Sequence, residues 1–264
     1  MYVDVHCHLN YPPINSRVDE IVANARKAGL GLVITAGTNP KANDDVLAIA
    51  ARFPDIVKAS LGLYPLDAIG FEEPEAPRKR EPFDADVEIQ RMESLAPKCV
   101  AYGEVGMDFK FVKDPVLVAK QKEIFRKILE MVERTKKPVI VHSRNAELEC
   151  IEMLETMSMK AVVMHCFGGR KSLITRAADK GWFFSVPPVI RRLQHFQILS
   201  QLVPVEQLLT ETDAPWLGPV VGQPNEPANV VVSVEEIAKA KRLDPAAVKE
   251  QVWKNAQGLF SRIS

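Results

Sequence analysis

The stretch YVDVHCH (residues 2–8) sets the pattern from which the fold of this chain can be inferred. It is short, rich in valine and alternates polar with apolar residues, which is typical of a β-strand. Side chains two residues apart on a strand point to the same face, so Asp4, His6 and His8 share one face and Cys7 lies on the other. Such a face can bind a metal ion, or it can be an ordinary solvated polar surface, and this stretch alone does not decide.

Seven further runs of this kind follow along the chain. They read GLVITAG, VKASLGLY, CVAYGEVG, PVIVHS, AVVMHCF, WFFSVP and LLTETD. Amphipathic helical patterns lie between most of them, for example at residues 16–29, 116–137 and 171–181, and strand–helix alternation favours parallel pairing. Eight repeats in a chain of 264 residues predict a (β/α)8 TIM barrel spanning residues 1–264 as a single domain. The alternative is an open doubly wound sheet, but no GxGxxG motif follows an early strand.

Several local signals refine this prediction. Ser16 is a candidate N-cap for the first helix, and Gly29 and Gly181 are candidate helix ends. Residues 71–86 contain three prolines and mixed charges, which indicates an exposed loop. Two closing helices are expected after Ser233, divided near residues 244–245, and no internal repeat is evident.

Composition limits the classes of function. The chain is 47% hydrophobic and 26% charged, with 34 basic and 34 acidic residues, so no overall charge attracts it to nucleic acid or membrane. Its four cysteines are scattered, which argues against a disulfide framework or a zinc finger. There is no basic segment followed by an apolar run, and no apolar stretch of about 18 residues. We therefore expect a cytoplasmic protein with no membrane segment and no obligate protein partner.

Histidines and acids recur where the predicted strands end. In a parallel barrel these ends share one face, where active sites lie. A single strand-end histidine is commonly a core or capping residue, but four of five histidines in this position, with two carboxylates, indicate a metal site. The six candidate ligands are His6, His8, Glu104, His142, His165 and Asp213.

Other polar residues near these strands receive structural interpretations. His195 lies in a helical pattern and is expected to be a surface or packing residue. Cys7 and Cys166 are expected to be buried on the opposite strand face. Asp4 is expected to hydrogen-bond a ligand imidazole, since such imidazoles usually need a partner for their other nitrogen.

Six nitrogen and oxygen ligands exceed the four that one zinc ion takes, so we expect two divalent ions that share a carboxylate. Two divalent ions would bring four positive charges against the two negative charges of Glu104 and Asp213. The remaining positive charge favours a phosphate, and two ions about 4 Å apart can bind both oxygens of an in-line displacement. Zinc suits this ligand set, and manganese or magnesium are also compatible.

The chain resembles the TatD family of metal-dependent deoxyribonucleases, within the amidohydrolase-like TIM barrels. The stretches that carry the resemblance are DVHCHL, GEVGMDF, KPVIVHSR, MHCFGG, ETDAPWLGP, NEPAN and KNAQGLF, in the order of the family. They cover nearly the whole chain. The resemblance implies hydrolysis of DNA phosphodiester bonds from a 3′ end of a single strand. Because the net charge is zero, we expect the strand to be held only locally, at its end.

The resemblance also implies residue roles. One ion would be held by His6, His8, Glu104 and Asp213, and the other by Glu104, His142 and His165, with Glu104 bridging. Asp213 would also orient or deprotonate the attacking water, so Asp213 and Glu104 are the implied catalytic residues.

Four further residues are implied to handle substrate or shape the pocket. Arg144 would contact a phosphate, and Asn225 and Glu226 would shape the pocket rim or brace ligands. The chain departs from the family at Tyr64, where many members have the histidine of a GxHP stretch, and at Pro224, where many have arginine. Tyr64 could hydrogen-bond or stack on a base.

Two other classes of function remain open at this point. The same chemistry could hydrolyse a carbonyl substrate, as in an amidohydrolase, an esterase or an aminoacyl-tRNA deacylase. Alternatively, the protein could bind metal without catalysis, although clustered charges at strand ends are costly to retain without an ion.

Overall fold

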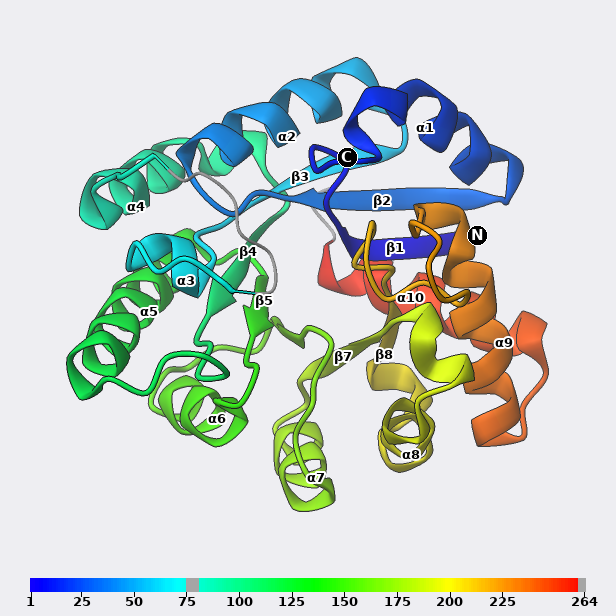
Figure 1. The fold of residues 1–264 in the computed structure, drawn as a ribbon. Coiled ribbons are helices and arrows are strands. Elements are labelled where there is room, and N and C mark those ends of the chain that lie inside the picture. Colours follow the sequence, from blue (N-terminus) through cyan, green and yellow to red (C-terminus); the bar gives the residue numbers. More distant parts are fainter. Residues whose placement is uncertain (75–80, 261–264) are drawn as a thin grey trace.

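A parallel barrel forms the centre of the computed structural model, which describes residues 1–74 and 81–260 (Figure 1). The sheet has eight parallel strands in chain order, and each pairs with the next. Their bounds are β1 Tyr2–Cys7, β2 Leu30–Ala36, β3 Val57–Leu61, β4 Ala101–Gly106, β5 Val139–His142, β6 Val162–Met164, β7 Phe183–Val186 and β8 Leu208–Thr210. The predicted (β/α)8 barrel is therefore confirmed.

Helices surround the strands on the outside (Figure 1). Their bounds are α1 Val18–Lys27, α2 Pro40–Arg52, α3 Pro65–Ala68, α4 Ala85–Ser94, α5 Pro115–Thr135, α6 Glu147–Glu155, α7 Lys171–Asp179, α8 Gln194–Leu202, α9 Val230–Lys241 and α10 Pro245–Leu259. Among the described residues, no helix has both the length and the apolar character needed to cross a bilayer.

Simple sequence signals explain where several helices begin and end. Asp114 and Asp244 accept hydrogen bonds from the first backbone N–H groups of α5 and α10, and each is followed by a proline at the first helical position. Gly29 and Gly181 adopt positive φ angles of 85° and 77° after α1 and α7, as expected for helix ends. Ser16 is not the N-cap that the sequence suggested, because α1 begins at Val18 and the Ser16 hydroxyl donates to the Pro13 carbonyl instead.

The two predicted closing helices are α9 and α10, and they divide at Asp244. Of the predicted loop at residues 71–86, residues 75–80 lie outside the described part, and the last two residues already belong to α4, which Asp84 caps. The start of the loop is not fully exposed, because the Glu73 side chain reaches into a pocket and is only 11% accessible.

The barrel closes where β8 meets β1, and a buried carboxylate holds this junction. Asp4 accepts hydrogen bonds from the Thr212 hydroxyl, from the Thr212 backbone N–H (2.9 Å) and from the His6 backbone N–H (3.2 Å). Burial raises the pKa of Asp4 to about 8, while these hydrogen bonds oppose the rise. The backbone N–H of Asp213 donates to the His6 carbonyl at 2.9 Å, so the residues that follow β8 are fixed against β1.

We predict that Asp4→Ala lowers the free energy of unfolding by about 2–4 kcal/mol, because buried donors on Thr212 and His6 lose their acceptor. Urea denaturation followed by circular dichroism measures this change. The control is Asp55→Ala, which removes an exposed ion pair with Arg26 and should change stability by less than about 0.5 kcal/mol. A similarly small effect for Asp4→Ala would show that the junction does not depend on this carboxylate.

Candidate metal centre

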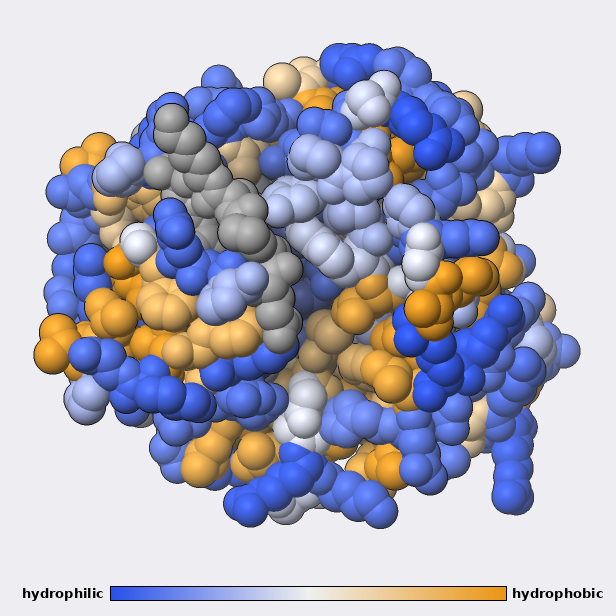
Figure 2. Space-filling view, viewed as in Figure 1, coloured by the Kyte–Doolittle hydropathy of each residue, from blue (hydrophilic) through white to orange (hydrophobic). Residues whose placement is uncertain are grey.

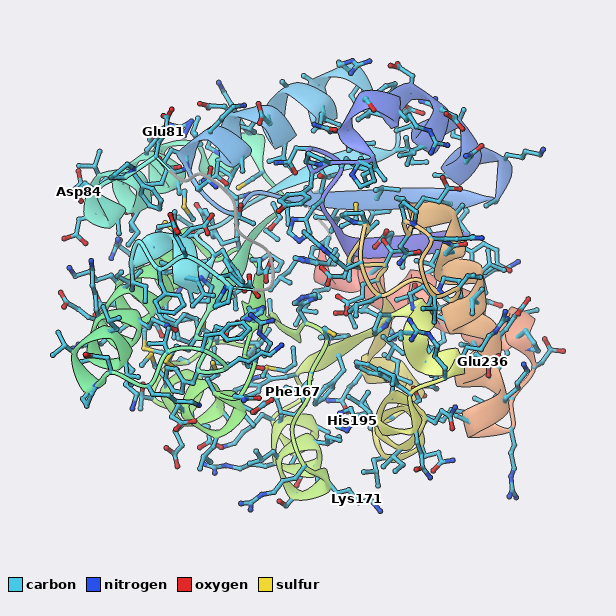
Figure 3. All side chains as sticks on the ribbon, viewed as in Figure 1. Glu81, Asp84, Phe167, Lys171, His195 and Glu236 are labelled. Atoms are coloured by element: carbon cyan, nitrogen blue, oxygen red, sulfur yellow. The ribbon has the colours of Figure 1, made fainter. Side chains whose placement is uncertain are left out.

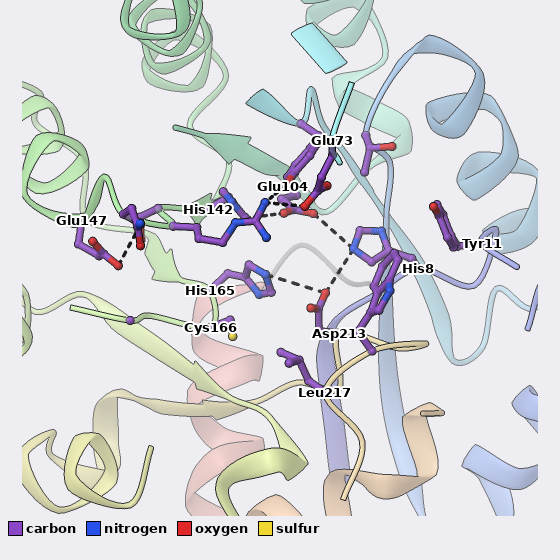
Figure 4. A pocket seen from close by; sticks show the side chains of 17 residues that line it. His8, Tyr11, Glu73, Glu104, His142, Glu147, His165, Cys166, Asp213 and Leu217 are labelled. Carbon is purple, nitrogen blue, oxygen red and sulfur yellow. Dashed lines mark hydrogen bonds and ion pairs between the residues drawn. The ribbon is translucent and has the colours of Figure 1, made fainter. Parts of the chain in front are cut away.

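The six predicted ligands converge at the carboxyl ends of the strands. His6 and Glu104 lie within β1 and β4, and His142 is the last residue of β5. The others follow β1, β6 and β8: His8, His165 and Asp213. All except His6 line one pocket, and Figure 4 shows Glu104 and Asp213 between His8 and His165.

Two histidine nitrogens lie close together, and an oxygen of each of two carboxylates lies near both of them. The Nε2 atoms of His6 and His8 are 3.2 Å apart. Oε2 of Glu104 lies 3.6 Å and 3.3 Å from those two atoms, and Oδ1 of Asp213 lies 3.5 Å and 3.4 Å from them. Ligand atoms about 2.0–2.2 Å from a tetrahedral ion are separated by roughly 3.3–3.6 Å. The donor atoms and their spacing therefore fit a divalent metal ion.

The electrostatics of this cluster favour positive charge. Burial alone would lower the pKa of His6, but the carboxylates of Asp213 and Glu104 outweigh burial and raise it to about 10. Burial would raise the pKa of Glu104, yet contacts with His142, His6 and His8 hold it well below its usual range. Both carboxylates thus remain charged in a buried site, as the binding of a cation requires.

Hydrogen bonds to the outer ring nitrogens orient two of the imidazoles. Nδ1 of His8 lies 3.1 Å from the Ala36 carbonyl, and Nδ1 of His165 lies 2.5 Å from Oε2 of Glu211. In both cases Nε2 is left to face the cluster, an arrangement typical of metal-bound histidines. Nδ1 of His6 is buried without a hydrogen-bond partner.

Glu211 is a functional candidate that the sequence analysis missed. It is fully buried, and besides His165 it accepts hydrogen bonds from the Ser185 hydroxyl (2.8 Å) and the Cys166 backbone N–H (2.9 Å). Its spacing was a usable signal, because Glu211 precedes Asp213 by two residues, just as Asp4 precedes His6.

His142 is placed differently from the other histidines. Its Nδ1 lies 2.7 Å from Oε1 of Glu104, and its Nε2 lies 2.9 Å from Oδ2 of Asp108. In the described part of the chain, two groups of residues have three possible ligand atoms that all lie within 4.8 Å of one another. One group is His6, Glu104 and His165, and the other is His6, His8 and Asp213. His142 borders this cluster through Glu104 but joins neither group.

Asp108 connects His142 to the candidate phosphate contact. This buried carboxylate, which the sequence analysis did not single out, also accepts a hydrogen bond from Nε of Arg144 at 2.7 Å. The other end of Arg144 donates to Glu73 at 2.7 Å and to the Tyr64 hydroxyl at 3.1 Å. The guanidinium is therefore fixed at the pocket wall, and two carboxylates already balance its charge.

Tyr64 lines the pocket, but its position does not suit the stacking role considered for it. Its side chain is largely buried, with 8% of the residue accessible, and its hydroxyl donates to Asp108 at 3.2 Å. Its ring meets the His142 ring edge-on, with 5.1 Å between centroids. Tyr64 thus orients Asp108 and Arg144 and offers little free face to a base.

The NEPAN residues brace the site from outside. The Asn225 amide donates at 2.8 Å to the carbonyls of Thr212 and Trp216, on either side of Asp213. Glu226 accepts hydrogen bonds from the Asn24 amide at 3.3 Å. Neither side chain lines the pocket, so the geometry supports the expected bracing role and not contact with substrate.

Three structural interpretations can now be compared with the structure. Asp4 does not hydrogen-bond a ligand imidazole, because its contacts are with backbone groups and Thr212. Cys7 is buried as expected, but Cys166 is only partly buried and lines the pocket. His195 is a packing residue in α8, and its Nε2 lies 2.8 Å from the Phe167 carbonyl (Figure 3).

Two glycines allow strands to approach the ligands closely. A Cβ atom on Gly62 would lie 2.4 Å from the backbone nitrogen of Glu104. A Cβ atom on Gly106 would lie 2.0 Å from the His142 carbonyl oxygen, and Gly106 has a φ of +140°. Only glycine fits at these two positions. The missing side chains allow the end of β3 to contact β4, and the end of β4 to contact β5.

A parallel eight-stranded barrel with histidines and carboxylates gathered at its strand ends defines a candidate metal-dependent enzyme of the TIM-barrel class. Residues 3–261 match the family described as TatD related DNase, so the chain belongs to the TatD family.

Individual relatives agree with this assignment. The chain is 31% identical to a protein named deoxyribonuclease TATDN3 of Homo sapiens, over 99% of this chain and 95% of that protein. It is 29% identical to an uncharacterized metal-dependent hydrolase of Methanocaldococcus jannaschii, over 99% of this chain and 97% of that protein. The crystal structure of YJJV, a TatD homolog from Escherichia coli, superposes with a TM-score of 0.85 at 26% identity, covering 98% of each chain.

We predict that Glu211→Gln weakens binding of a divalent ion about 10–100-fold, because the carboxylate that orients His165 is lost. Titration calorimetry with Mn²⁺ or Zn²⁺ after chelation measures the affinity. Glu147→Gln is the matched control, since Glu147 lines the same pocket but lies outside both ligand groups. If both variants bind the ion like the parent, Glu211 has no part in orienting a ligand.

Proposed function

We propose that this protein is a metal-dependent deoxyribonuclease that removes nucleotides from the 3′ end of single-stranded DNA. The observation that carries the proposal is the cluster of His6, His8, Glu104 and Asp213 beside a pocket that also contains Arg144: one oxygen of each carboxylate lies within 3.6 Å of both imidazole nitrogens. Membership of the TatD family and the printed names of the relatives support the substrate class.

Two divalent ions, zinc, magnesium or manganese, are proposed to occupy the site. His6, His8, Glu104 and Asp213 would hold one, and Glu104, His142 and His165 would hold the other. When bound, the ions would neutralise charge on the phosphodiester and lower the pKa of the attacking water toward neutrality.

Asp213 is proposed to take the proton of that water. It follows β8 with a φ of 53°, a left-handed conformation that aspartate tolerates better than most residues. Its side chain is 17% accessible, more than the other ligand candidates, so a water molecule can reach it. Contacts with His6 and His8 keep the pKa of Asp213 low despite burial, so its carboxylate is ionised and can accept a hydrogen bond from that water.

Arg144 is proposed to bind a phosphate of the substrate. Its side chain is 31% accessible at the pocket wall, and Asp108 fixes its orientation. Because Glu73 accepts a hydrogen bond from one end of the guanidinium, an incoming phosphate would compete with that carboxylate.

Metal-dependent cleavage of a fluorescent single-stranded DNA, compared with deacylation of an aminoacyl-tRNA, tests the proposed reaction. DNA cleavage that EDTA abolishes and added metal restores is the expected result. Deacylation without DNA cleavage would reject the nuclease and favour the carbonyl hydrolase, and ion binding without either activity would favour a metal-binding protein.

Metal analysis of protein that has been chelated and then reconstituted should approach two ions per chain. His142→Ala should lower this value toward one, because in the proposed site His142 holds only the second ion. A parent value that saturates at one ion or fewer would contradict the two-ion site.

Asp213→Asn should reduce turnover on the order of 100-fold or more, because the amide keeps the shape of the side chain but cannot accept the proton. Steady-state cleavage assays measure the loss, and circular dichroism establishes that the variant is folded. Near-parental activity would remove Asp213 from the mechanism.

Cutting should begin at a strand end and involve few phosphate contacts, because the net charge is zero. The sequence has only short basic clusters, such as residues 78–80 and 191–192. Residues 78–80 lie outside the described part, and Arg191 pairs with Glu235 and Glu236. We expect log affinity to fall with log salt with a slope of roughly −1 to −3. We also expect linear single-stranded DNA to be cut and circular DNA to be spared. Equal cleavage of the circle, or a slope steeper than about −5, would indicate an extended basic track.

A further inference from the structure

Two aromatic side chains form one wall of the pocket, and none of the roles assigned above uses them. They are Tyr11, which follows β1, and Trp216, which follows β8, and both line the pocket. Their ring centroids are 4.7 Å apart, with an angle of 54° between planes. In residues 1–74 and 81–260, Trp216 is the only aromatic residue in the exposed class, with 40% of its surface accessible.

Both aromatic residues are fixed directly beside metal-ligand candidates. Tyr11 lies three residues after His8, and its backbone N–H donates to the His8 carbonyl at 2.9 Å. Trp216 lies three residues after Asp213, and its backbone N–H donates to the Asp213 carbonyl at 2.9 Å. The Trp216 ring also meets the His8 ring edge-on at 5.5 Å between centroids. The rings therefore have a defined position relative to the reacting centre.

The opposite wall of the pocket has a different chemistry. There Arg144, Glu73 and the Tyr64 hydroxyl form a charged and polar network. Figure 4 places Tyr11 beyond His8, on the side of the pocket away from His142 and Glu147. In Figure 2 a hollow opens near the centre of the molecule, with hydrophobic residues along part of its border. A ligand that fills this pocket needs an anionic part and a flat apolar part.

We infer that Tyr11 and Trp216 form a stacking subsite for a base of the substrate strand, next to the phosphate that is cleaved. This inference rests on the proposed nuclease function and deepens it, because it assigns the recognition of the base to one wall. Aromatic stacking accepts every base, so the subsite selects a nucleotide that carries a base over an abasic one without reading sequence.

The test uses metal-loaded enzyme and pairs of single-stranded oligonucleotides that differ only in one abasic tetrahydrofuran residue, placed at each of the last three positions. The measured quantity is the ratio of kcat/KM for the intact strand to that for the abasic strand. At one position the parent should prefer the intact strand by roughly 10-fold or more. Trp216→Ala and Tyr11→Ala should bring this ratio toward one, while Trp216→Phe and Tyr11→Phe should keep most of it.

Val221→Ala is the matched control, because Val221 is exposed in the same loop but does not line the pocket. It should leave the ratio unchanged. Binding provides a second readout in EDTA, where the intact oligonucleotide should quench tryptophan fluorescence of the parent more than the abasic one does. Trp216→Phe should lose this quenching, because the other two tryptophans of the chain, Trp182 and Trp253, do not line the pocket.

The outcomes separate the inference from the proposed function. A parent that cleaves no DNA with any metal rejects the nuclease, and quenching that depends on the base and on Trp216 would still support the subsite. DNA cleavage with the same ratio in the parent, Trp216→Ala and Tyr11→Ala would overturn the subsite alone. If, in addition, the parent self-associates and Trp216→Ala does not, the aromatic wall is a contact between copies of the chain.

Discussion

The contact between the end of β8 and β1 is the constraint on which the site depends. His6 lies in the first strand and His8 directly follows it, whereas Asp213 follows the last strand, more than 200 residues later in the chain. Closure of the barrel brings these groups together, and Asp4 fixes the two strand ends to each other through Thr212. The remaining ligand candidates join from β4, β5 and β6, because parallel strands direct their carboxyl ends to one face.

Charge balance then determines how the surrounding residues are arranged. Four acidic side chains, Glu104, Asp108, Glu211 and Asp213, lie within or beside the histidine cluster, and three of them are fully or almost fully buried. Each contacts at least one imidazole, and Asp108 also contacts Arg144. Buried carboxylates without such partners would strongly destabilise the fold. The cluster is therefore a balanced network in which a cation is the natural central component.

The sequence was sufficient to predict the barrel and the six residues at the strand ends. Short apolar strands of regular spacing and histidines at their ends are local patterns, so they can be recognised without coordinates. Glu211 also carried a local signal, because it is an acidic residue two positions before Asp213, directly after β8. The role of Asp108 could not be predicted in this way, since it follows the last residue of β4, where strand alternation no longer applies. The burial of Tyr64 and the position of Glu73 depend on loop packing between distant segments, which no periodicity encodes.

The pairing of Glu73 with Arg144 has a consequence for selectivity among ligands. A carboxylate attached to the same chain competes at an effective concentration of the order of millimolar or higher, without any loss of translational freedom. A small anion that contacts Arg144 alone must overcome this intramolecular competitor and gains little by doing so. A phosphodiester that is held simultaneously at the strand ends can displace Glu73, because its second point of attachment offsets the cost. With Arg144 in the proposed phosphate-binding role, Glu73 would therefore favour multidentate ligands over free anions.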